Sequence, residues 1–219
     1  YKVLTKCNEK DFSGFLFGNL HQSVANLVMY TSRNQEIVRG KPMKIHNPRT
    51  PMQTEARIRF KAANQLVARL HQAAAVGFPS AYVTASRNAF VRANRQAFDL
   101  DGTLVAHLDS RRLVFSAGQQ LSPAMKATFS DGQFRVASAV QNISAFSTRE
   151  DLLYLVLWED ERLAAHLIIF GKRGNVLKQI YPIPVRWSPS HTFVYCFAIS
   201  ANGKRASNSL LLWDGSREV

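Results

Sequence analysis

The stretch that decides the fold runs from residue 152 to residue 158 and reads Leu152-Leu153-Tyr154-Leu155-Val156-Leu157-Trp158. A short, continuous apolar run of this kind indicates a strand at the centre of a sheet. We therefore predict a central β-strand here, with either Trp158 or Trp187 as the aromatic core.

The sequence around this stretch also carries strand signals. After residues 99–102 the apolar pattern changes to a period of two, with turn signals between the runs at 131–132, 171–174 and 202–203. The runs lie at residues 103–108, 112–116, 126–130, 133–140, 152–158, 162–170, 176–181, 191–200 and 205–213. This spacing predicts an all-β sandwich over residues 101–219, of immunoglobulin-like or fibronectin-III-like type.

The first hundred residues have a different pattern. Short apolar runs between residues 12 and 45, with the polar turn Ser32-Arg33-Asn34-Gln35, predict a β-hairpin. In the segment Asn47-Pro48-Arg49-Thr50-Pro51-Met52-Gln53, two prolines favour an extended chain until Thr50 caps a helix. Gln53 would complete a capping box.

Two helices are predicted behind this cap. In the first, from Met52 to about Val76, one apolar stripe is expected to face the core, and it consists of Ala56, Phe60, Ala63, Val67, Leu70 and Ala74. The second runs from Thr84 to about Phe98, with Ala89, Phe90, Ala93 and Ala97 expected inward. The fold class is therefore α+β, with a basic hairpin and helical region over 1–100 and the sandwich over 101–219.

The positive charge of the chain is unevenly distributed. The net charge is +13, and residues 1–100 hold 15 Lys and Arg against 5 Asp and Glu, whereas the remainder holds 13 against 10. An excess of this kind points to a polyanionic partner such as nucleic acid, an acidic protein surface or anionic lipid. The candidate polyanion-binding residues are Arg49, Arg57, Arg59, Lys61, Arg69, Arg87, Arg92 and Arg95.

These cations have few acidic neighbours in the sequence, so their field is not cancelled locally. Most are arginines, which suits bidentate recognition of phosphate or carboxylate better than solubility alone. Aromatic platforms for stacking bases are not obvious among them, and we expect contact without sequence readout. The alternative is a solvated basic face.

Catalytic and metal-binding motifs are not apparent. The six histidines, His21, His46, His71, His107, His166 and His191, are scattered without ligand spacing. Residues 171–174 lack the length of a phosphate loop and are expected to form a hairpin turn. The acidic cluster Glu159-Asp160-Glu161 is expected to be a solvated turn. We predict no enzyme activity, no metal and no cofactor.

Cysteine use and hydropathy leave the compartment open. Cys196 lies in an apolar run and is expected to be a buried free thiol, and a disulfide to the distant Cys7 is not expected. No apolar stretch approaches the roughly 18 to 20 residues that cross a bilayer, and no signal segment opens the chain. The chain begins at Tyr1, so removal of a leader is left open. A cytoplasmic or virion-associated location is favoured over secretion.

Two segments carry a resemblance to a known family. Residues 37–42 with the Asn-Pro-Arg-Thr-Pro-Met-Gln motif at 47–53, and the closing segment 193–209, resemble a family of uncharacterised bacteroidete proteins of similar length with an immunoglobulin-like C-terminal region. The chain departs from that family's pattern at residues 12–19. The resemblance implies no activity.

Two functional classes remain. In the first, the chain is a non-catalytic structural or binding subunit of a larger assembly, such as a phage particle or nucleoprotein complex. Its basic helices would then contact nucleic acid non-specifically or an acidic neighbour, and its sandwich would contact other protein subunits. In the second, it is a secreted or cell-surface adhesion module. The charge asymmetry favours the first class.

Overall fold

The computed structural model describes residues 22–24, 26–32, 35–41, 47, 49–80 and 82–216. The chain divides into two compact units, residues 1–49 and residues 50–219. The mixed α+β class predicted from the sequence is confirmed, because helices and antiparallel sheets are both present.

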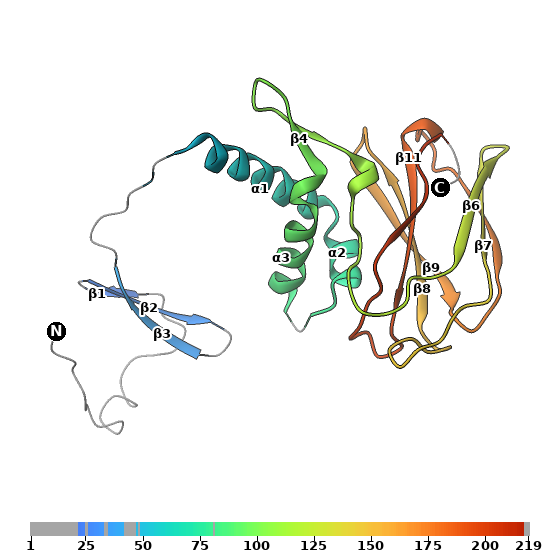
Figure 1. The fold of residues 1–219 in the computed structure, drawn as a ribbon, viewed down its shortest axis with the longest axis horizontal. Helices are drawn as coiled ribbons and strands as arrows, with labels where there is room; N and C mark the ends of the chain where they lie inside the picture. Colours follow the sequence, from blue (N-terminus) through green and yellow to red (C-terminus); the bar gives the residue numbers. More distant parts are fainter. Residues whose placement is uncertain are drawn as a thin grey trace. The chain divides into compact units, whose positions relative to one another are not determined.

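The first unit contains a small antiparallel sheet (Figure 1). Its order is β1-β2-β3, formed by β1 (Gln22–Val24), β2 (Leu27–Ser32) and β3 (Gln35–Gly40). The predicted hairpin corresponds to β2 and β3, which pair from Leu27↔Gly40 to Ser32↔Gln35. Strand β1 is an addition, and residues 12–21 of the predicted hairpin region lie outside the described residues.

The second unit has three layers, which Figure 1 shows as helices beside two facing sheets. The helices are α1 (Pro51–Arg69), α2 (His71–Gly77) and α3 (Val83–Asn94), followed by the short helix η1 (Arg95–Ala97). The four-stranded sheet has the order β12-β11-β8-β9, from β12 (Leu210–Trp213), β11 (Thr192–Ile199), β8 (Leu152–Glu159) and β9 (Ala164–Lys172). The three-stranded sheet has the order β10-β7-β6, from β10 (Lys178–Pro182), β7 (Gln133–Ser138) and β6 (Met125–Ser130).

The four-stranded sheet is apolar on both faces because each face is covered. Along β8, Leu153 and Leu155 face the three-stranded sheet, whereas Val156 and Trp158 face the helices. Strand β8 is hydrogen-bonded on both edges, so the prediction of a central strand at 152–158 is confirmed. Trp158 is fully buried, and its indole Nε1 donates to Ser110 Oγ at 2.8 Å.

The start of α1 agrees with the predicted cap. Thr50 has extended backbone angles, Pro51 is the first helical residue, and the Thr50 side chain accepts the N–H of Gln53 at 3.3 Å. This bond satisfies one of the free N–H groups of the first turn.

The predicted apolar stripe of α1 is only partly buried. Ala63, Val67 and Leu70 are in the core as predicted, but Ala56 and Phe60 are exposed. The first half of α1 extends past the part of the layer formed by α2 and α3 (Figure 1). The inward assignment of Ala56 and Phe60 is therefore wrong, because no other helix covers them in the part of the chain that the structure describes.

The segment between the helices and the sheet contains a second departure. Residues 112–116, predicted as a strand, begin in the short helix η2 (Ser110–Arg112) and continue as irregular chain. Phe115 lies there, fully buried and 4.8 Å from the Tyr195 ring centroid. Gly77 of α2 packs so closely that a Cβ would lie 1.8 Å from the Phe115 carbonyl oxygen, which explains the glycine.

The predicted boundary at residue 100 falls inside the second unit. Strand β4 (Phe98–Leu100) pairs there with β5 (Ala106–Leu108), and one buried cluster combines helix residues such as Phe90 with sheet residues such as Tyr195. Whether residues 101–219 fold alone stays a prediction.

Residues 171–174 do not form the expected hairpin turn. Gly171 and Lys172 end β9, and the chain then passes to β10 in the other sheet. Arg173 is buried: its Nε lies 3.4 Å from Asp151 Oδ2, and its guanidinium donates to the Leu121 carbonyl oxygen at 2.7 Å. This ion pair joins three loops at one end of the sandwich.

Candidate functional site

The structure distributes the eight predicted polyanion-binding residues over both units. Arg49 lies in the first unit, exposed and with a φ of 49°. The other seven lie on α1, α3 and η1 of the second unit, where Arg59 is half-buried and the remaining six are exposed. Arg87 and Arg92 of α3 and Arg95 of η1 are all exposed to solvent.

Three of these seven come together in one groove. Arg57 and Arg59 of α1 and Arg95 of η1 line a depression of about 700 Å³ together with Phe60 and Met52. Ala56 and Gln96 complete its lining. We call this depression the arginine groove. Its volume is within the roughly 300–1,000 Å³ that is usual for ligand sites.

The arginine groove follows from how the two elements end. Helix α1 continues N-terminally beyond its buried residues Ala63, Leu66 and Val67, whereas α3 stops at Asn94 and gives way to η1. The inner face of the first turns of α1 is therefore left beside η1, with no third helix over it among the described residues. The lining of the groove therefore combines arginines with apolar side chains.

Arg59 is held in place by two contacts. Its Nε donates to the backbone oxygen of Phe98 at 3.2 Å, and one terminal nitrogen lies 3.3 Å from Glu55 Oε2. Glu55 is one helical turn away on α1, and both side chains are partly exposed. Such a pair contributes about 0.3–0.5 kcal/mol. Arg59 therefore positions the groove wall, and part of its charge is compensated.

The other basic residues of the helical layer are dispersed. Within the described part of the chain, Lys61, Arg87, Arg92 and Arg95 make no ion pair. Of these four, only Arg95 lines the arginine groove. Arg69 lies at the other end of α1 and lines a separate pocket.

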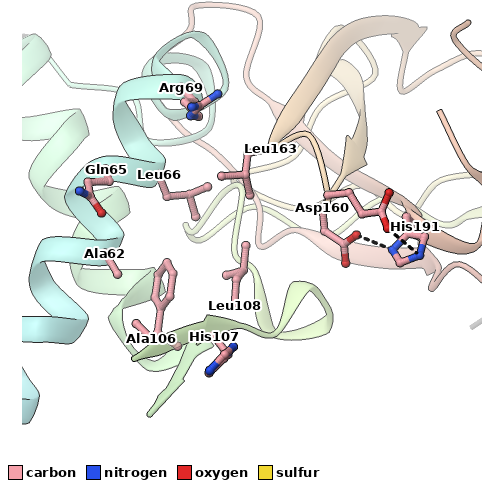
Figure 2. A pocket seen from close by; sticks show the side chains of 12 residues that line it. Ala62, Gln65, Leu66, Arg69, Ala106, His107, Leu108, Asp160, Leu163 and His191 are labelled. Carbon is pink, nitrogen blue, oxygen red and sulfur yellow. Dashed lines mark hydrogen bonds and ion pairs between the residues drawn. The ribbon is translucent and has the colours of Figure 1, made fainter. Parts of the chain in front are cut away.

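That separate pocket has a volume of about 550 Å³ and lies between α1, the β4–β5 hairpin and the turn after β8. Figure 2 shows Leu66, Leu108 and Leu163 converging within it, with Arg69 at the α1 side and the Asp160–His191 pair on the sheet side. We call it the His191 pocket.

Both ring nitrogens of His191 are engaged by carboxylates. Nδ1 lies 3.0 Å from Asp160 Oδ1, and Nε2 lies 3.3 Å from Glu161 Oε1. The hydrogen bond to Asp160 raises the pKa of His191, and the negative charges of Glu161 and Glu159 act in the same direction. When His191 is protonated, both of its N–H groups have a carboxylate partner.

The acidic turn differs from the prediction at one position. Glu161 is exposed, as a solvated turn requires, but Glu159 is fully buried. Its Oε2 accepts the N–H of Arg162 at 2.6 Å, and its Oε1 has no hydrogen-bond partner among the described residues. The prediction of a solvated turn is therefore wrong for Glu159, because its buried carboxylate accepts the backbone N–H of Arg162 within the turn.

Sequence reasoning missed two features of these sites. It assigned Phe60 to the core, because helical periodicity gives the face of a residue but not where the covering element ends. It also left His191 unassigned, because His191 meets Asp160 only through strand pairing between β8 and β11. Thr192↔Glu159 pairing places the two turns side by side.

The remaining chemistry of the described residues is limited. Cys196 lies in the middle of β11 without a disulfide, and burial raises its pKa to about 12, so the thiol is protonated at neutral pH. Among the described residues, no cluster of three His, Cys, Asp or Glu side chains is arranged to hold a metal ion. None of their helices is long and apolar enough to cross a membrane.

Comparisons with known proteins assign no role to the residues of either site. No protein-family model, no curated protein and no solved structure matches the chain.

Proposed function

We propose that the chain is a non-catalytic binding subunit of a larger assembly, such as a phage particle or nucleoprotein complex, and that its helical layer contacts nucleic acid through phosphates. The observation that carries this proposal is the arginine groove. Arg57, Arg59 and Arg95, three residues selected from the sequence for charge alone, line one concave surface. Guanidinium groups are suited to phosphate oxygens.

The charge balance of the helical layer supports the same partner. Residues 50–97 contain seven Lys and Arg and a single acidic residue, Glu55, which Arg59 already engages. The first turn of α1 carries no acidic side chain that would offset the positive end of the helix dipole. A phosphate backbone therefore meets little repulsion on this side of the unit.

The sandwich supports a protein contact within the same assembly. Large apolar side chains are exposed in the loops at one end, namely Leu121, Val140, Ile143 and Phe146. The buried Arg173–Asp151 pair and the bond from Gln120 Nε2 to the Phe146 carbonyl oxygen hold these loops together. Exposed apolar side chains gathered in one region are typical of protein interaction sites. The immunoglobulin-like type of the sandwich and membership of the bacteroidete family stay predictions.

Binding of the full chain to labelled random-sequence duplex DNA tests the proposal. Fluorescence anisotropy would compare the wild type with a variant carrying Arg57→Ala, Arg87→Ala, Arg92→Ala and Arg95→Ala. A control variant removes the same charge from exposed positions in the strands and loops of the second unit. It carries Lys126→Ala, Arg149→Ala, Lys178→Ala and Lys204→Ala.

We expect the variant with the four substitutions on α1, α3 and η1 to lose most of its affinity for DNA, and the control variant to keep its affinity. Equal loss in both variants would mean that net charge alone drives binding. No binding by the wild type would reject nucleic acid as the partner and favour an acidic protein or the secreted adhesion module.

A further inference from the structure

Phe60 occupies an unusual position for an aromatic side chain. It is 58% exposed, and no ring or cation packs against its ring among the described residues. It shares the arginine groove with Met52, which is 80% exposed. Leaving these side chains in water forgoes the burial energy that a core position would give.

The residues around Phe60 indicate the chemistry of a ligand that would cover it. Arg57, Arg59 and Arg95 line the same depression, and the Arg59 guanidinium is already bonded to Glu55 and to the Phe98 carbonyl oxygen. An occupant complementary to this lining combines negative charge with an apolar or aromatic face. An unpaired nucleotide has both, because its phosphate carries the charge and its base offers a π-face of the kind that stacks on aromatic side chains.

We infer that the arginine groove binds single-stranded nucleic acid, with Phe60 as the stacking platform for an unpaired base and the arginines on the neighbouring phosphates. This inference rests on the proposed function and names its substrate more closely. A duplex would still meet the arginines through its phosphates. Its bases are already stacked on one another, so they cannot reach Phe60.

The same geometry predicts tolerance of sequence. Each base has a π-face, and no side-chain amide that could read base edges lines the groove apart from Gln96. We expect binding to depend on the presence of bases rather than on their order.

The test compares three labelled DNA probes on the full chain at one salt concentration: a mixed-sequence single strand, an abasic strand of equal length and a mixed-sequence duplex. The variants are Phe60→Ala, Phe60→Leu and Phe60→Trp. Val185→Ala is the control, because Val185 is a highly exposed apolar residue outside the groove. Phe60→Leu keeps an apolar side chain and removes only the ring.

Phe60→Ala and Phe60→Leu should weaken single-strand binding by about 5- to 140-fold, which corresponds to about 1–3 kcal/mol for one stacked base. Phe60→Trp and the control should bind like the wild type. The affinity for the duplex and the affinity for the abasic strand should each be the same in all variants. The wild type should bind the abasic strand as weakly as Phe60→Ala binds the single strand that carries bases.

Two outcomes would overturn the inference while the proposed function stands. One is duplex binding by the wild type together with full single-strand affinity in Phe60→Leu. The other is a loss in Phe60→Ala that is equal for all three probes. A wild type that binds none of the probes would instead reject the proposed function, and the inference with it.

Discussion

Asn94 and Val114 are joined by two hydrogen bonds: Asn94 Nδ2 donates to the Val114 carbonyl oxygen at 2.8 Å, and Asn94 Oδ1 accepts the Val114 N–H at 2.7 Å. Asn94 is fully buried, and Nδ2 also donates to the Phe90 carbonyl oxygen at 3.0 Å. The end of α3 is therefore fastened to the segment that passes between the helices and the sheet.

Replacing Asn94 should destabilise the second unit. In Asn94→Ala the Val114 N–H and carbonyl groups lose their partner, and each orphaned polar group costs about 1–3 kcal/mol. Urea unfolding monitored by circular dichroism would measure the change. Asn88→Ala, at an exposed position of the same helix, is the control and should leave the midpoint unchanged. Equal midpoints for Asn94→Ala and the wild type would contradict the role of this contact.

Two fragments test where the domain boundary lies. Residues 50–219 should fold cooperatively, whereas residues 101–219 lack the helices that cover Trp158, Tyr195 and Phe197. The shorter fragment should bind a hydrophobic dye and aggregate, because a large apolar sheet face is exposed. A monomeric, cooperatively unfolding β protein from residues 101–219 would instead support the boundary predicted from the sequence.

Much of the fold could be predicted because its signals are local. The cap at Thr50, the alternation of β6 and β7 and the continuous apolar run of β8 depend on neighbouring residues only. The layering could not be predicted in this way. The apolar run of β8 fits any strand covered on both faces, and only the tertiary structure shows that the second cover is helical.

The candidate sites show the same division. Composition identified the basic residues, but only the ends of α1 and α3 decide that Arg57 and Arg95 share a groove while Arg87 and Arg92 do not. The burial of Arg173 escaped prediction because its partner Asp151 lies in another loop. In the sequence Arg173 lies between Gly171 and Gly174, which is a context typical of an exposed turn.

The cap at Thr50 predicts a measurable contribution to stability. Thr50→Ala removes the acceptor for the Gln53 N–H and should lower the free energy of unfolding by about 0.5–2 kcal/mol. Thr50→Asp, which keeps an acceptor at this position, should retain most of it. Thermal melting of the three proteins checks the prediction, and an unchanged melt for Thr50→Ala would mean that this bond contributes nothing.

His191 predicts a pH dependence of stability. Asp160 raises the pKa of His191 above its ordinary value of 6.5, so the pairing stabilises the fold fully below pH 6.5 and is lost as the pH rises through the raised pKa. The melting temperature of His191→Gln should therefore fall below that of the wild type at acidic pH, and the difference should shrink at alkaline pH. His71→Gln, at an exposed position on α2, is the control. A difference that grows with pH would contradict the pairing.

The most direct test of the central claim is the salt dependence of nucleic-acid binding by the full chain. If the arginine groove engages phosphates, log affinity for random-sequence duplex DNA should fall linearly with log salt, with a slope of about −0.9 for each phosphate engaged. Arg57→Ala and Arg95→Ala should each reduce the size of that slope by about one unit and weaken all sequences alike, whereas Arg149→Ala should not. A wild-type slope that survives unchanged in the Arg57→Ala, Arg95→Ala double variant would contradict the account.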